Sequence, residues 1–144
     1  MALVVFWSGV SLAIVLFDHH GQIIWRGMIV ALGLHFVISE MLIKRGLKKK
    51  LGSRERPYLA HPASIHPLGR KFKDSSFPSS HVSSIVAIMT VICIFHPVLI
   101  APACFLTVGL AFSRVHCGMH YPSDVLAGSV LGVAYGWAAF ILVR

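Results

Sequence analysis

The sequence predicts an all-α fold, a polytopic bundle of about five transmembrane helices with its polar groups gathered at one membrane face. Hydrophobic residues make up 56% of the 144 residues and charged residues only 12%, and the mean hydropathy is +0.78. Soluble domains carry about 25% charged residues, so this composition favours a membrane protein. The apolar residues also fall into separate runs divided by polar stretches, which is the pattern of successive spans and loops.

The whole chain, residues 1–144, is expected to form a single integral-membrane domain. We place the spans at about 2–17, 23–43, 80–95, 98–113 and 122–143, and a polar loop at 44–79. The first run is short, because a helix of that length covers only ~24 Å of a hydrocarbon core ~30 Å thick. A signal peptide is the alternative, but no basic residue precedes this run and no small-residue cleavage site follows it.

The second span carries two ionisable residues, His35 and Glu40. Ionisable groups inside a bilayer are costly, which makes them candidates for a functional role. Glu40 lies four residues before Lys44, however, and a simple ion pair near the interface is the alternative that we prefer.

Basic residues are concentrated in the loop that follows. Ten of the thirteen Lys and Arg lie in residues 44–73, and the net charge is +8. Such a cluster is typical of a solvated face beside anionic lipid headgroups, so membrane lipids are the expected surroundings. A single loop between apolar spans disfavours the other usual partner of basic segments, nucleic acid. His61 and His66 in this loop lack Cys or carboxylate partners at ligand spacing, so no metal site is expected.

The third span begins directly after the stretch Pro78-Ser79-Ser80-His81. Proline and serine before an apolar run are helix-start signals. Ser79 and Ser80 are therefore expected where free backbone N–H groups and the positive end of the helix dipole can bind an anion. His81 would lie at the same helix mouth.

A second polar stretch, residues 112–124, holds Arg114, His120 and Asp124. Pro122 suits the first turn of a helix, so the last span is expected to begin there. Asp124, about one turn after His120, can hold one imidazole nitrogen and leave the other free to act as a nucleophile. The planar fork of Arg114 fits phosphate oxygens. Together these side chains indicate phosphoryl chemistry.

Glycines recur at four-residue spacing in the last span. They are Gly128, Gly132 and Gly136. Small residues at this spacing allow another helix to approach closely, so we expect a packing face there.

The predicted topology brings the polar stretches to one side of the membrane. The residues that can converge there are Lys49, Arg56, Ser79, His81, Arg114, His120 and Asp124. Such a set could surround a tetrahedral oxyanion, with one histidine as nucleophile and the other as the acid that protonates the leaving oxygen. The cations would stabilise the charge that develops on the equatorial oxygens.

These residues resemble the three motifs of the type 2 phosphatidic acid phosphatase family, Lys-x6-Arg-Pro, Pro-Ser-Gly-His and Ser-Arg-x5-His-x3-Asp. They occur in order as Lys49…Arg56-Pro57, Pro78-Ser79-Ser80-His81 and Ser113-Arg114…His120…Asp124. The resemblance implies that Lys49, Arg56 and Arg114 bind the phosphate. It also implies that His81 is the general acid, that His120 forms a phosphohistidine and that Asp124 orients it, with no metal or other cofactor.

The sequence departs from the family pattern in two ways. Ser80 replaces the family's glycine, which keeps a backbone N–H donor but adds a side chain facing the phosphate. Members of the family in membranes also commonly have six spans, whereas we count about five. Either an N-terminal helix is absent or this chain needs only a minimal core.

By this resemblance we expect a metal-independent membrane phosphatase that removes the terminal phosphate of a lipid phosphate or diphosphate. Phosphatidate, phosphatidylglycerol phosphate and polyprenyl diphosphate are the candidate substrates. One alternative is a lipid-binding or transport protein in which Ser80 has silenced the chemistry. Another is a vanadate-dependent haloperoxidase, because the oxyanion pocket of that class resembles the one predicted here. Members of that class are typically soluble, however, and the apolar runs argue against it.

The distribution of basic residues and the family resemblance predict opposite sides of the membrane for the active site. Charge bias would place the basic loop in the cytoplasm. The resemblance suggests an extracytoplasmic site in a bacterial or archaeal plasma membrane, and we follow the resemblance.

Overall fold

A computed structural model describes residues 19–47, 54–67, 72 and 74–144. Its secondary structure is helical, and these described residues contain no strand, so the predicted all-α class is confirmed. The expected first span at 2–17 and the motif residue Lys49 lie outside the described residues.

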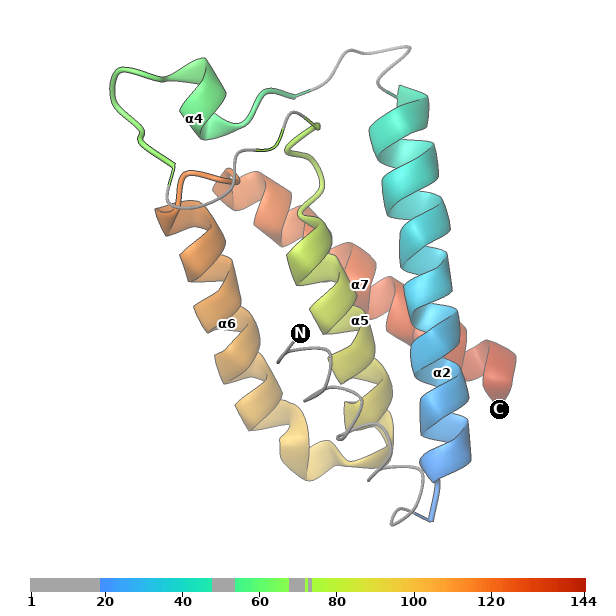
Figure 1. Ribbon diagram of the computed structural model, residues 1–144. Coiled ribbons are helices and arrows are strands. Elements are labelled where there is room, and N and C mark those ends of the chain that lie inside the picture. The colour runs from blue at the N-terminus through green and yellow to red at the C-terminus, as the bar shows by residue number, and fades with distance from the viewer. Residues whose placement is uncertain (1–18, 48–53, 68–71, 73) are drawn as a thin grey trace, which may run out of the picture.

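The described residues form one long helix, a short loop helix and three further apolar helices (Figure 1). Helix α2 (Gly21–Leu34) continues without a break as the π-helix η1 (His35–Leu47), and α4 (Pro57–Ala60) is a single turn in the polar loop. Helix α5 (Ser80–Phe95) is followed by the 3₁₀ turn η2 (Pro97–Leu99), by α6 (Ile100–His116) and by α7 (Pro122–Val143).

Within the residues that the structure describes, three segments are long and apolar enough to cross a membrane. They are Gly21–Gly46, Pro97–His116 and Pro122–Val143, while the apolar helix α5 is shorter at 16 residues. Their outer faces carry bare apolar side chains, such as Phe105 at 80% exposure and Val130 at 72%. Surfaces of this kind belong in lipid rather than water, so the chain is a membrane protein.

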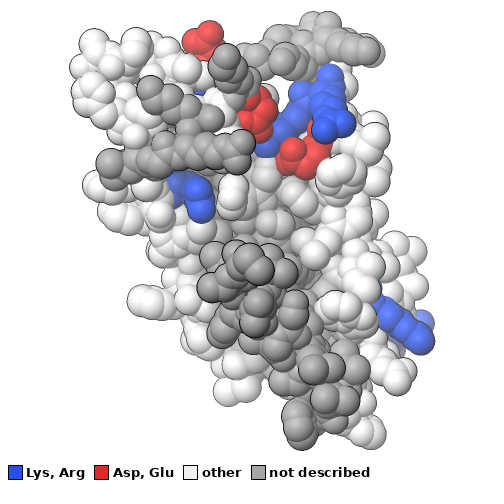
Figure 2. Space-filling model, viewed as in Figure 1, with Lys and Arg blue, Asp and Glu red and all other residues white. Residues whose placement is uncertain are grey.

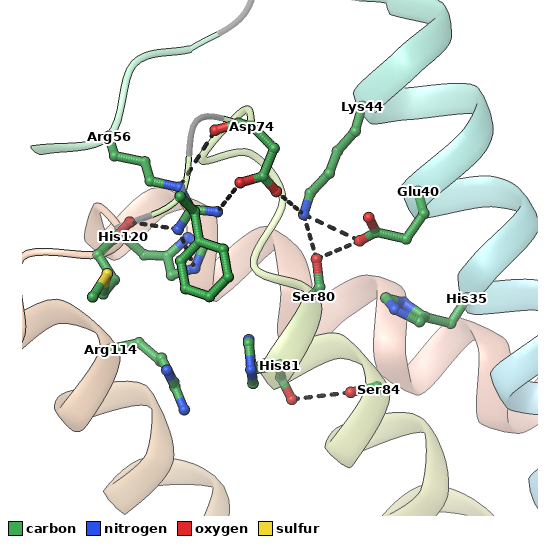
Figure 3. Close-up of a pocket in the computed structure, with 12 residues that line it drawn as sticks. His35, Glu40, Lys44, Arg56, Asp74, Ser80, His81, Ser84, Arg114 and His120 are labelled. Atoms are coloured by element: carbon green, nitrogen blue, oxygen red, sulfur yellow. Dashed lines mark hydrogen bonds and ion pairs between the residues drawn. The ribbon is translucent and has the colours of Figure 1, made fainter. Parts of the chain in front are cut away.

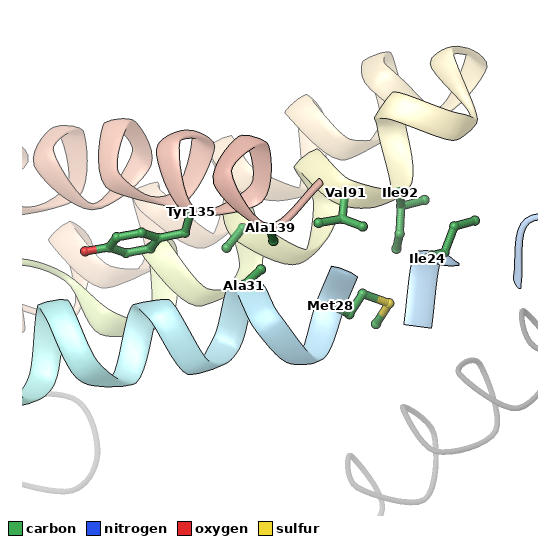
Figure 4. Close-up of a cluster of buried hydrophobic side chains, with 8 residues drawn as sticks. Ile24, Met28, Ala31, Val91, Ile92, Tyr135 and Ala139 are labelled. Carbon is green, nitrogen blue, oxygen red and sulfur yellow. The ribbon is translucent and has the colours of Figure 1, made fainter. Parts of the chain in front are cut away.

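Helices α2, α5 and α7 pack against one another and share the main core (Figure 4). The buried cluster consists of Ile24, Met28 and Ala31 from α2, Ala87, Val91 and Ile92 from α5, and Tyr135 and Ala139 from α7. A polar contact joins α7 to η1, the continuation of α2, because the hydroxyl groups of Ser39 and Tyr135 lie 2.9 Å apart. The core therefore fixes where the first turns of α5 and α7 sit relative to η1.

Glycines let α7 pack directly on the backbone of α5, as the spacing predicted. A Cβ added to Gly128 would lie 2.8 Å from the carbonyl oxygen of Ser79, and one on Gly132 would lie 2.6 Å from Cβ of Val86. Both distances are shorter than normal contacts between such atoms. Small residues are thus required along this helix pair.

Polar residues gather at one end of the bundle. Helix α4 lies above the end of α6 and the start of α7, at the same end of the bundle as the start of α5 and the end of η1 (Figure 1). In the space-filling view, charged side chains of the described residues are concentrated at this same end (Figure 2). Sequence segments that are far apart are therefore assembled into one polar surface.

Candidate functional site

A cavity of about 260 Å³ opens at the polar end of the bundle (Figure 3). Its wall is formed by η1, the first turn of α5, the last turn of α6 and the two polar loops. The lining residues are His35, Glu40, Lys44, Arg56, Phe72, Asp74, Ser80, His81, Ser84, Arg114, Met119 and His120.

His120 is placed by the tight turn between α6 and α7. Gly118 adopts a positive φ of 66°, which favours glycine, and the N–H groups of Met119 and His120 donate to the carbonyl of Arg114 at 3.2 and 3.3 Å. Pro122 then starts α7, with its fixed φ suited to the first helical position. The imidazole of His120 is thereby held at 3% exposure.

The hydrogen bonds of His120 define which ring nitrogen is free. Nδ1 lies 2.8 Å from the carbonyl oxygen of Ser76. A carbonyl only accepts, so in the neutral ring Nδ1 carries the proton and Nε2 keeps its lone pair. Nε2 lies 3.4 Å from Nη1 of Arg56. The arrangement leaves a nucleophilic nitrogen beside a fixed cation.

Asp124 lies behind His120 rather than on the cavity wall. It is fully buried, and its Oδ2 accepts the Tyr121 N–H at 2.9 Å and lies 3.8 Å from Nδ1 of His120. Its Oδ1 pairs with Nη1 of Arg54 at 2.7 Å. Arg54 also contacts the ring of Tyr121, with its guanidinium carbon 4.3 Å from the ring centroid. The carboxylate is therefore shared between a helix start, an arginine and the histidine.

Arg56 is locked in place by protein acceptors on three sides. Its Nη1 donates to the carbonyl of Met119 at 3.2 Å, and its Nε donates to the carbonyl of Asp74 at 3.3 Å. Its Nη2 pairs with Oδ1 of Asp74 at 2.8 Å. Pro57 starts α4 immediately afterwards, so the backbone turns away and the guanidinium, 4% exposed, points inward. Such a preorganised fork suits an oxyanion.

A second cation, Lys44, enters the cavity from η1. Its Nζ lies 3.1 Å from Glu40 and 3.4 Å from Asp74, and it also donates to the hydroxyl of Ser80, which in turn donates to Glu40. The expected pairing of Glu40 with Lys44 is confirmed, although both residues also line the cavity. Burial alone would raise the pKa of the Asp74 carboxyl, but the hydrogen bond and charge of Arg56, together with Lys44, hold this pKa below its ordinary value.

His81 and Arg114 complete the wall from α5 and α6. His81 is the second residue of α5 and stays exposed at the cavity, while Arg114 lies in the last turn of α6. Nε of Arg114 is buried and has no hydrogen-bond partner among the described residues. A buried donor of this kind is costly to leave unpaired, so it suits a bound anion.

The structure brings together most of the residues predicted from sequence. Those that line the cavity are Arg56, Ser80, His81, Arg114 and His120. Ser79 does not, because it is fully buried against α7 and its N–H donates to the Asp124 carbonyl at 3.0 Å. In this structure Ser79 therefore contacts α7 rather than the cavity.

Four contributors were missed by sequence reasoning. They are Lys44 in η1, Arg54 and Asp74 in the polar loop, and the backbone carbonyl of Ser76. The four-residue spacing of Glu40 and Lys44 predicted an ion pair between them, but it did not indicate that both residues line a cavity. A backbone carbonyl gives no signal, because every residue has one.

No metal-binding group is found among the residues that the structure describes. Their His, Cys, Asp and Glu side chains form no cluster of three or more that could hold an ion. The positive charge at the cavity comes from Lys44, Arg56 and Arg114.

The family model described as "PAP2 superfamily" matches residues 24–144. The chain is 33% identical over 108 residues to "Bacitracin transport permease protein BcrC" of Bacillus licheniformis, covering 75% of this chain and 52% of that protein. It is 33% identical over 85 residues to "Undecaprenyl-diphosphatase BcrC" of Bacillus subtilis (strain 168), covering 59% and 43% respectively.

A "Lipid A 1-phosphatase" of Rhizobium etli is 31% identical over 108 residues, which cover 73% of this chain and 45% of that protein. The chain thus spans about half the length of the curated relatives that it matches. No solved structure matches it.

Proposed function

Because the chain belongs to the PAP2 superfamily, we propose that it is a membrane phosphatase that hydrolyses the terminal phosphate of a lipid phosphate or diphosphate. The observation that carries this proposal is the orientation of His120. Its Nδ1 is tied to the Ser76 carbonyl at 2.8 Å, so Nε2 keeps its lone pair and faces Nη1 of Arg56 at 3.4 Å. This is the arrangement that nucleophilic catalysis by histidine requires.

In the proposed first step, Nε2 of His120 attacks the terminal phosphorus. A P–N bond forms while the bond between phosphorus and the leaving oxygen breaks, and that oxygen keeps the electron pair. His81 donates a proton to it, so the lipid alcohol or lipid monophosphate departs. Water then attacks the phosphohistidine, with His81 accepting its proton, and inorganic phosphate leaves as His120 is regenerated.

The arginines are proposed to stabilise the charge on the transferring phosphoryl group. Arg56 is already held by the backbone carbonyl groups of Met119 and Asp74, so it needs little reorganisation when charge develops. Arg114 contributes the buried Nε, for which a phosphoryl oxygen would supply the missing acceptor. Both guanidinium groups have the planar geometry that phosphate oxygens accept.

A lipid rather than a soluble ester is the proposed substrate. The cavity lies where two candidate spans, Gly21–Gly46 and Pro97–His116, and α5 meet the polar loops, and the flanks of these helices carry exposed apolar side chains. A lipid phosphate could place its headgroup in the cavity while its chain stays in the bilayer. The names of two relatives, an undecaprenyl-diphosphatase and a lipid A 1-phosphatase, support the same class.

The test is phosphate release from a panel of lipid phosphates by the purified chain in detergent micelles. His120→Ala should abolish release from every substrate, whereas His116→Ala should not, since His116 is exposed on α6 and lies outside the cavity lining. Acid quenching with labelled substrate should trap phosphate on the wild type and none on His120→Ala. Lipid binding without any phosphate release would instead favour a binding or transport role.

We place the active site on the extracytoplasmic face of the membrane. Ser64 is exposed in the loop that follows α4, and α4 lies at the same end of the bundle as the start of α5, which lines the cavity (Figure 1). It therefore offers a position for labelling. In a Cys117→Ser background, Ser64→Cys should react with a membrane-impermeant maleimide applied to intact cells. Reaction only after permeabilisation would place the site in the cytoplasm.

A further inference from the structure

We infer that the cavity contains a second anion subsite, formed by Lys44 and Ser80, which binds the inner phosphate of a lipid diphosphate. This inference rests on the proposed function and narrows it from lipid phosphates in general to diphosphates. Lys44 lies outside the three sequence motifs. Ser80 lies within the second motif, at the position where the family has glycine.

The side chain of Asp74 marks the subsite. Its carboxylate bridges two cations, with Oδ1 2.8 Å from Nη2 of Arg56 and Oδ2 3.4 Å from Nζ of Lys44. An anion thus already fits between these groups. Asp74 comes from a loop and its side chain is 47% exposed, so it can rotate into solvent when a substrate anion takes its place.

Lys44 is unusually well placed for a phosphate. Its side chain is only 7% exposed although it carries a positive charge, and it stays paired with Glu40 at 3.1 Å. Buried ammonium groups are costly unless anions surround them. When Asp74 leaves, the oxygens of an incoming phosphate would restore the second anionic partner.

Ser80 fixes the direction of the lysine. Its hydroxyl accepts a hydrogen bond from Nζ and donates one to Glu40. A glycine at this position could make neither bond. The departure from the family motif at Ser80 therefore gives the ammonium group a defined orientation toward the cavity.

The geometry of in-line displacement explains why this subsite would bind the inner phosphate. The leaving group departs on the side of phosphorus opposite the nucleophile. In Figure 3, His120 lies on one side of the cavity together with Arg56, while Lys44 and Ser80 lie across from it. The inner phosphate of a diphosphate, which is the leaving group and gains charge as the P–O bond breaks, would therefore meet Lys44.

Two substrates with the same prenyl chain provide the test, the diphosphate and the monophosphate, assayed with the full chain in detergent. Loss of one charge-assisted contact predicts that Lys44→Gln lowers kcat/KM for the diphosphate roughly 10-fold to 100-fold and for the monophosphate by less than about 3-fold. Lys44→Arg, which keeps the charge, should retain most of the preference. Arg45→Gln is the matched control, because it removes the same charge from an exposed neighbour that does not line the cavity.

The outcomes separate the two proposals. Phosphate release from both substrates by wild type, with equal losses on both in Lys44→Gln, would overturn the subsite and leave the phosphatase intact. Equal effects of Lys44→Gln and Arg45→Gln would overturn it as well, since the lysine would then act only through general charge. If wild type released phosphate from neither substrate, the proposed function itself would fail. Should Lys44→Gln not fold, Ser80→Gly removes the hydroxyl group that orients Lys44. A larger loss of kcat/KM for the diphosphate than for the monophosphate would support the subsite, whereas equal losses on both substrates would overturn it.

Discussion

The contact between α5 and α7 can be tested by adding a single methyl group. Gly132 is buried in α7, and an added Cβ would lie 2.6 Å from Cβ of Val86 and 2.7 Å from the carbonyl oxygen of Ser83. Neither neighbour is the flexible end of a side chain, so the two helices must separate. Ser83 is one turn after the start of α5, so the movement would also displace His81.

The expected cost of Gly132→Ala follows from these distances. Normal separations between carbon atoms are ~3.5–4.0 Å, so the helices would have to move apart by roughly 1 Å. Overpacking of this kind typically costs about 1–3 kcal/mol, against which the better helix propensity of alanine returns about 1 kcal/mol. A displacement of about 1 Å at a catalytic group can also lower the rate by roughly 100-fold. We therefore expect a modest loss of stability and a large loss of activity.

The assay compares Gly132→Ala with Gly109→Ala in the same detergent. Gly109 is also helical, in α6, but no atom of the described residues lies within 4 Å of a Cβ placed there. Unfolding in denaturant and phosphate release should both change for Gly132→Ala and stay close to wild type for Gly109→Ala. If the two variants were equally stable and equally active, the close packing of α5 on α7 would be refuted.

Three further predictions concern the site itself. His81→Ala should lose most activity on substrates whose leaving group is a lipid alkoxide, and less on a nitrophenyl phosphate, because a good leaving group needs little protonation; equal losses on both would argue against His81 as the acid. Arg54→Gln should lower the free energy of unfolding by about 1 kcal/mol, because the substitution removes an ionic partner from buried Asp124. The effect is small because the Arg54 side chain is 42% exposed and solvent screens the pair. In denaturant unfolding the control is Arg26→Gln, on the exposed face of α2. Phosphate release should persist in EDTA, because guanidinium and ammonium groups supply the positive charge at the cavity; loss of activity that zinc restored would contradict this.

Local sequence signals predicted the class of the fold and the starts of two helices. The apolar runs gave the all-α class, and the family resemblance drawn from the three motifs is confirmed by the match over residues 24–144. Helix α5 begins at Ser80 and α7 at Pro122, where serine and proline signals placed them. Such features depend on neighbouring residues, so they can be read without knowing how the helices pack.

The division of work between Ser79 and Ser80 could not be read from the sequence. Both serines carry the same helix-start signal. Only the rotation of α5 against α7 decides that Ser79 is buried over Gly128 while Ser80 faces the cavity and binds Lys44. That rotation follows from the whole helix interface rather than from the two residues.

The sequence by itself therefore determined the chemical types at the site: histidines, arginines and a carboxylate on an apolar helical frame. The tertiary structure decided their partners. It tied His120 to the carbonyl of Ser76, Asp124 to Arg54, and Lys44 to Asp74. The physical reason is that these contacts join segments 30 to 70 residues apart or use backbone atoms common to all residues. Their geometry is set by helix packing, which no local pattern records.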